Sequence, residues 1–183
     1  MTEKALTRYD STTIALHWAT AISVLALWTI GQTADMLPHN IADGVVWPIH
    51  VVWGFALVAL VAWRVIWRNM GGAELPAADT GMLQLAAKTT HYLLYALLAA
   101  ALVLGVANAF VRGYSLFGLF SLPQIGDRAW RRPITEWHEL AANALLVLAL
   151  LHAAAALAHH YLLRDGVLRR MLPAPVSREA AKL

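Results

Sequence analysis

The feature that most constrains this chain is the grouping of its apolar residues into four long runs. The runs cover roughly residues 14–30, 45–66, 92–111 and 140–163. Each is close to the roughly 20 residues that an α-helix needs to cross a hydrocarbon layer about 30 Å thick. None alternates with the period of two expected of a membrane barrel strand, and such strands are about half as long. The sequence therefore predicts an all-α membrane protein, a four-helix transmembrane bundle with helices at about 12–33, 44–68, 86–111 and 134–163.

The composition agrees with a bilayer as the main partner and gives no sign of nucleic-acid binding. Hydrophobic residues make up 60% of the 183 residues and charged residues only 14%, whereas soluble domains carry about 25% charge. The first run does not resemble a cleaved signal peptide, because Glu3 and Asp10 precede it, His17 interrupts it, and no small-residue cleavage pattern follows before Asp35. We expect one domain over residues 1–172 and a frayed cytoplasmic tail over 173–183.

The distribution of Lys and Arg predicts the orientation. The connection over residues 32–44 carries no Lys or Arg, and the connection over 112–133 carries only four. The remaining ten belong to the opposite side of a four-helix topology: Lys4, Arg8, Arg64, Arg68, Lys88, Arg164, Arg169, Arg170, Arg178 and Lys182. The positive-inside rule then puts both termini and the middle loop in the cytoplasm, as for a multi-pass protein of the bacterial inner membrane.

Four histidines interrupt the apolar runs, where an unpartnered imidazole is costly: His17, His50, His138 and His152. His138 and His152 are 14 residues apart, which is almost four helical turns, so both project from nearly one face, about 21 Å apart along the axis. With alternating helix directions, His50 and His138 share the periplasmic depth, and His17 and His152 share the cytoplasmic depth. Ionisable groups inside membrane helices indicate function.

Two imidazoles at one depth suit a six-coordinate b-type haem. Zinc fits less well, because its sites need three or four protein ligands around one point. The chain has no cysteine, which excludes thiolate ligands and iron–sulfur clusters. Small residues near the ligands, such as Gly54, Ala142 and Ala153, would leave room for a flat cofactor, although they also serve plain helix packing. A single intramembrane histidine could simply bond a neighbouring helix, but two at each depth predict two haems.

The other histidines have weaker signals. His39 lies in the first periplasmic connection and is expected to be solvated, and His91 is expected to be a polar anchor at the start of the third run. His159 and His160 lie about two turns beyond His152. One of them, which we assign as His159, could bind a quinone carbonyl.

Four segments resemble the bacterial cytochrome b561 family. They are residues 15–18 (ALHW), 49–51 (IHV), 136–139 (EWHE) and 151–161 (LHAAAALAHHY), the last continuing through 168–173 (LRRMLP). The resemblance covers nearly the whole chain and is best in the fourth run. It implies a four-helix protein with two haem b groups, held by His17 and His152 on the inner side and by His50 and His138 on the outer side.

The resemblance also implies an activity, oxidation of periplasmic superoxide to dioxygen with transfer of electrons to ubiquinone. Arg112, Arg128, Arg131 and Arg132 all belong to the outer connection, and a basic rim there would attract a small anion such as superoxide. Ordinary loop charge explains these arginines equally well. An alternative function is a haem b electron carrier within a larger respiratory complex such as a hydrogenase or dehydrogenase. A haem-free transporter or scaffold would leave the four histidines unexplained.

Overall fold

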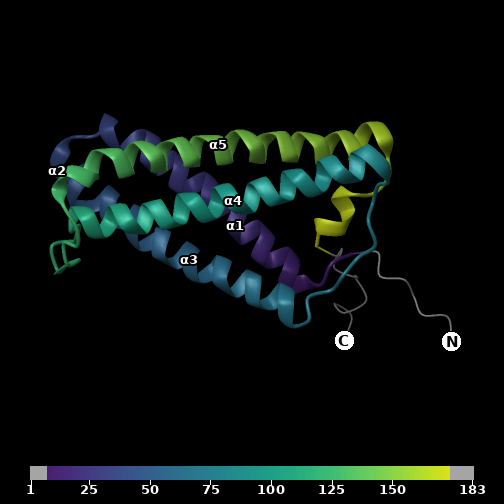
Figure 1. Cartoon of the computed structure of the whole chain (residues 1–183), viewed down its shortest axis with the longest axis horizontal. Helices are drawn as coiled ribbons and strands as arrows, with labels where there is room; N and C mark the ends of the chain where they lie inside the picture. Colours follow the sequence, from purple (N-terminus) through teal and green to yellow (C-terminus); the bar gives the residue numbers. More distant parts are fainter. Residues whose placement is uncertain (1–7, 174–183) are drawn as a thin grey trace, which may run out of the picture.

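Four long helices cross the molecule side by side in alternating directions (Figure 1). The computed structural model describes residues 8–173, in which these helices are α1 (Ser11–Thr33), α3 (Trp47–Met70), α4 (Gly81–Arg112) and α5 (Arg131–Ala158). The start of α1, the α3–α4 link and the end of α5 lie at one end of the bundle, and the α4–α5 link lies at the other. This is the predicted four-helix bundle, and the first and last described residues lie at one end of it.

Short elements complete the connections. Between α1 and α3 the chain forms a 3-10 turn (Ala34–Met36), α2 (His39–Ile41) and a π-helical turn (Ala42–Val46). Between α4 and α5, β1 (Ser115–Leu116) pairs antiparallel with β2 (Phe120–Ser121), and a 3-10 turn (Arg128–Trp130) leads into α5. A π-helical turn (His159–Leu163) extends α5, and a 3-10 turn (Leu168–Met171) follows it.

The helix ends follow from local chemistry. Asp10 caps α1 by accepting a hydrogen bond from the Thr13 backbone N–H at 2.8 Å. Pro48 occupies the first turn of α3, where no N–H is needed. Gly113 ends α4 with φ 64°, the left-handed conformation that glycine adopts without strain. Helix α4 begins at Gly81, earlier than the expected residue 86, because the helix continues ahead of the apolar run that starts at residue 92.

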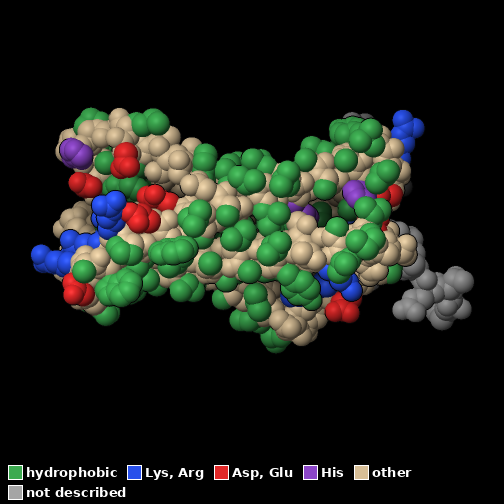
Figure 2. Space-filling view, turned by 45° about the horizontal axis from the view of Figure 1, so that its top comes forward, with side chains coloured by type: hydrophobic (Ala, Val, Ile, Leu, Met, Phe, Trp, Pro, Cys, Tyr) green, Lys and Arg blue, Asp and Glu red, His purple; other side chains and the backbone are tan. Residues whose placement is uncertain are grey.

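The surface is that of a membrane protein. All four helical spans are long and apolar enough to cross a bilayer: Ser11–Met36, His39–Met70, Gly81–Arg112 and Arg128–Leu163. Large apolar side chains face outward along them, such as Ile22 at 61% exposed and Val103 at 68%. Figure 2 shows this apolar surface over the middle of the molecule, with most charged side chains near the two ends. So many exposed apolar side chains are rare on water-soluble proteins, and in a membrane lipid would cover them.

The bundle is built from two helix pairs, α1 with α3 and α4 with α5, which have the most extensive packing. Polar side chains add bonds between helices: Trp53 Nε1–H donates to Ser23 Oγ at 3.2 Å, and Trp28 Nε1–H donates to Asn143 Oδ1 at 2.8 Å. Of the basic residues used to predict orientation, Lys4, Arg178 and Lys182 lie outside the described residues, as does the expected tail beyond Pro173. The described ones follow the predicted distribution between the two ends.

Candidate functional site

His50 of α3 and His138 of α5 meet near the end of the bundle that holds the α4–α5 link. Their ring centroids are 6.3 Å apart and the rings are nearly perpendicular, at 84°. Two imidazoles bound to opposite sides of one metal, with metal–nitrogen bonds of about 2.0 Å, place their centroids on the order of 6 Å apart. The structure thus brings together the two histidines expected at the outer depth.

The Nδ1 atoms of the two rings have different surroundings. His138 Nδ1–H donates to the backbone carbonyl of Ala101 at 2.9 Å. Since a carbonyl only accepts, this bond places the proton on Nδ1 and leaves Nε2 with a free lone pair, as a metal ligand requires. His50 Nδ1 is buried without a hydrogen-bond partner, although the backbone carbonyl of Leu27 is near enough to interact with it.

Glycines shape the space around this histidine pair. Gly31, Gly54 and Gly105 line a cavity of about 370 Å³ together with both rings. A Cβ on Gly105 would lie 3.0 Å from His138 Cε1, and one on Gly31 would lie 3.7 Å from His50 Cε1. Only a glycine at position 105 therefore lets the His138 ring occupy its place without displacement. A cavity lined by two imidazoles, with one buried nitrogen still unpaired, fits a b-type haem.

The cavity also contains charged groups near its outer end. Arg112 is held by Asn108 Oδ1, which accepts from Nε at 3.0 Å, and by Thr135 Oγ1, which accepts from Nη2 at 2.8 Å. Three carboxylates share the lining with this arginine: Asp35, Asp43 and Glu139. Tyr114 lies beside them, and burial raises the pKa of its phenol. The cavity thus presents one fixed cation among more numerous acidic groups.

The other three arginines expected at this rim do not line the cavity. Arg131 donates to the backbone carbonyls of Val111 and Arg112 at 3.3 and 3.2 Å, so it closes the end of α4. Arg132 forms an exposed ion pair with Glu136 at 2.7 Å, and Arg128 is exposed in the 3-10 turn before α5. Of these four arginines, Arg112 therefore reaches the cavity. Arg128 and Arg132 lie at the surface, and Arg131 bonds the end of α4.

The histidines expected on the cytoplasmic side form a second group with an unexpected member. The His152 ring lies against His91 of α4, with centroids 5.3 Å apart, rather than against His17. His17 Nδ1 accepts a hydrogen bond from Arg64 Nη2–H at 3.3 Å, and its ring is close enough to His91 and His152 to interact electrostatically. The inner depth thus holds three imidazoles and one guanidinium. Sequence reasoning missed His91 because its partner on α5 is distant along the chain.

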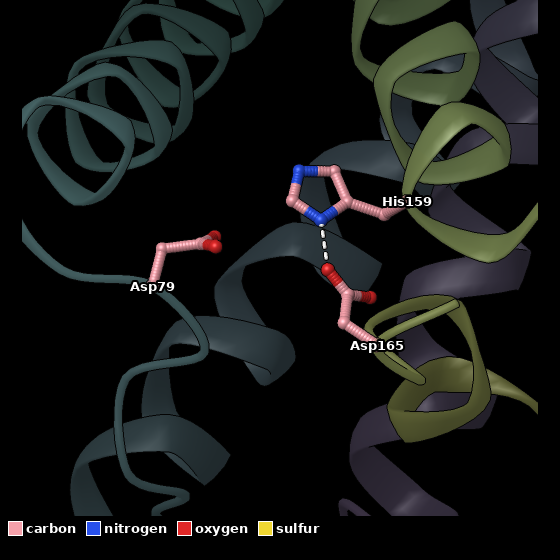
Figure 3. Close-up of side chains that lie close together, drawn as sticks. All are labelled: Asp79, His159 and Asp165. Carbon is pink, nitrogen blue, oxygen red and sulfur yellow. Dashed lines mark hydrogen bonds and ion pairs between the residues drawn. The ribbon is translucent and has the colours of Figure 1, made fainter. Parts of the chain in front are cut away.

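His159, the expected quinone contact, lies in the π-helical turn after α5. Its Nδ1 pairs with a carboxylate oxygen of Asp165, and Asp79 from the α3–α4 link faces the same ring (Figure 3). The backbone N–H of Val167 bonds Asp165 Oδ1 at 3.0 Å, and this bond, followed by the one from His159, lowers the pKa of Asp165. This cluster lies at the surface, at the end of the bundle that holds the α3–α4 link.

Known proteins are similar to this chain over nearly its full length. Residues 8–174 match the family model described as prokaryotic cytochrome b561. The chain is 28% identical to a probable superoxide oxidase CybB of Yersinia pestis over 171 residues, covering 91% of this chain and 96% of the relative. It is 30% identical to cytochrome b561 homolog 2 of Escherichia coli K12 over 175 residues, covering 90% and 91%. It is 34% identical to cytochrome b562 of Cereibacter sphaeroides over 169 residues, covering 90% and 94%.

Proposed function

The chain belongs to the prokaryotic cytochrome b561 family, a group of membrane electron-transfer proteins, and on that premise we propose that it holds two b-type haems in series across the bacterial inner membrane. Four helices long and apolar enough to span a bilayer provide the frame. The observation that carries the proposal is the convergence of His50 and His138 on a cavity whose glycines leave room for their rings.

His50 and His138 would ligate the outer haem, and His17 and His152 the inner one. The Ala101 carbonyl supports the first assignment, since it holds His138 with Nε2 free. The second assignment requires a small rearrangement, because in this structure His152 contacts His91 and His17 accepts from Arg64. A haem bound by two imidazoles supplies one-electron redox chemistry with no open position for substrate. The chain's own part is to hold the rings and keep water away from the irons.

Superoxide is the proposed electron donor and ubiquinone the proposed acceptor. The similarity to a probable superoxide oxidase over nearly the full length of both chains supports the donor. Among the described arginines, Arg112 lines the outer cavity, so it is the residue suited to bind the anion. Arg128 lies in the 3-10 turn before α5, and Arg131 and Arg132 begin α5. His159, fixed by Asp165 near the cytoplasmic end, is the proposed quinone contact. Since Asp165 engages Nδ1, the ring would meet the quinone through Nε2.

A second candidate function is that of a haem b subunit that carries electrons within a larger complex. Two of the three relatives have names that denote a cytochrome and no substrate, which favours an electron carrier as much as an oxidase. In that case the outer surface would contact a protein donor instead of a small anion.

Anaerobic reduction of the purified protein by a superoxide source tests between these functions. The superoxide oxidase proposal expects the haem absorbance to change from the oxidised to the reduced form, and to reoxidise when a ubiquinone analogue is added. Replacement of Arg112 by Gln should slow the reduction more than replacement of Arg128 by Gln, which serves as the matched control. A stable protein with two haems that superoxide does not reduce would favour the electron-carrier function.

A further inference from the structure

The two histidine sites differ in the charged side chains beside them. At the inner site Arg64 of α3 lies partly buried, with its guanidinium bonded to His17 and its Cζ 5.6 Å from the centroid of the Tyr95 ring. Arginine stays protonated in any protein environment, and a cation within a membrane-spanning helix is costly enough to indicate a function. No other part of the proposed function uses Arg64.

This cation acts on the whole inner site. Arg64 interacts electrostatically with His17, His91 and His152. Arg64 therefore places a positive charge beside all three rings of the inner site.

The outer site has more carboxylates than cationic side chains around it. Glu139, next to His138 along α5, acts on the His138 ring. Asp35 and Asp43 line the same cavity, so Arg112 faces three carboxylates there. Because these three carboxylates outnumber the one arginine in the lining, negative charge is in excess at the outer site.

Charge beside an iron changes its affinity for an electron. Reduction lowers the charge on the metal by one, so a nearby cation favours the reduced state and a nearby anion opposes it. In a low-dielectric bundle this Coulomb effect is large and is screened little by salt. Iron bound at Nε2 would leave a proton on His17 Nδ1, so the bond from Arg64 would break when haem binds. The guanidinium beside the ring would still keep its full positive charge.

We propose that Arg64 gives the inner haem the higher reduction potential, and that this difference directs electrons from the His50–His138 site to the His17–His152 site. In the step concerned one electron leaves the outer iron, which is oxidised, and reaches the inner iron, which is reduced; no proton moves and no bond forms or breaks. Arg64 thus acts on the inner haem through its positive charge and is not a haem ligand. The inference rests on the proposed two-haem function.

Redox titration of the full chain, purified with its haems and followed by absorbance, tests this inference. The His138→Ala variant, which lacks an outer ligand, identifies which of the two potentials belongs to the inner haem. We expect Arg64→Gln to lower the inner potential and leave the outer one nearly unchanged, whereas Arg64→Lys, which keeps the charge, should stay close to the wild type. Arg68→Gln is the matched control, because Arg68 lies one turn further along α3 and bonds the carbonyl of Ala73 outside the site.

An inner potential that does not change in Arg64→Gln, or that is already the lower of the two in the wild type, would overturn the inference. If Arg64→Gln fails to retain the inner haem, the wild type and His138→Ala decide the matter, because together they show which haem has the higher potential. An inner potential that is the lower of the two would then overturn the inference. A wild-type protein that binds fewer than two haems would instead refute the proposed function.

Discussion

At the scale of single residues, Gly105 is the most specific requirement of the outer site. Any side chain at this position would press on the His138 ring, since even a Cβ would lie 3.0 Å from Cε1. Gly105→Val should therefore displace His138 and reduce binding of the outer haem, while the inner haem is retained. Haem content measured per polypeptide checks this prediction. Gly44→Ala is the control, because a Cβ on Gly44 would meet nothing within 4 Å.

Asp10 is a second residue with a measurable role, since it joins three segments. Besides capping α1, it accepts hydrogen bonds from Trp67 Nε1–H of α3 and from the backbone N–H of Ala73, each at 3.1 Å. Slight burial raises its pKa, but the hydrogen bonds from Thr13, Ala73 and Trp67 outweigh it and hold the pKa well below the ordinary value. Because the carboxylate is needed for these bonds, they stabilise the fold at neutral pH.

This depressed pKa predicts a pH dependence. A carboxyl group whose folded pKa is below its unfolded value, about 3.9, contributes stability above that value and loses it as the pH falls toward the folded pKa. Asp10→Asn keeps one oxygen to cap α1 but loses the second acceptor, which bonds the Ala73 N–H. It should therefore be less stable than the wild type at pH 7 by about 1 kcal/mol, the usual size of one hydrogen bond. The difference should shrink as the pH is lowered below 4. Thermal unfolding in detergent measures both, and a difference that stays constant with pH would contradict the role of the carboxylate.

At the scale of elements, Arg131 connects the two most extensively packed helices. Its guanidinium closes the end of α4 by donating to the carbonyls of Val111 and Arg112 while its backbone begins α5. Arg131→Gln should destabilise the protein by about 1 kcal/mol, since charged hydrogen bonds to partly exposed carbonyls are worth little more. Arg128→Gln, at an exposed position of the same loop, should have almost no effect. Equal melting temperatures for the two variants would show that Arg131 does not hold the α4–α5 connection.

The elements also show how far sequence alone can reach. Apolar runs of the right length predicted all four helices, and the alternation of directions predicted that His50 and His138 would meet. The pattern could not predict the start of α4 at Gly81, because the first turns of this helix precede the apolar run. It also could not predict the contact of His91 with His152, or Asp35 and Asp43 in the outer cavity. Those contacts depend on how helices rotate and pack, and helical spacing describes only one helix at a time.

At the scale of the whole molecule, the charge at the outer end predicts a salt effect. If superoxide is attracted by Arg112 and the exposed Arg128 and Arg132, the reduction rate should fall as ionic strength rises, since screening shortens the range of the field. The carboxylates Asp35, Asp43 and Glu139 in the cavity oppose this attraction, so the effect should be modest. A rate that increases with salt would show that these carboxylates dominate and that the donor is not a small anion.

The central claim concerns the whole chain: one polypeptide holds two haems through two pairs of histidines. Haem content per polypeptide, determined on purified wild type and on His50→Ala, His138→Ala, His17→Ala and His152→Ala, tests it most directly. The account predicts two haems in the wild type and one in each variant, with one spectrum shared by the His50 and His138 variants and a different one shared by the His17 and His152 variants. A single haem in the wild type, or a His17→Ala variant that loses the same haem as His50→Ala, would contradict it.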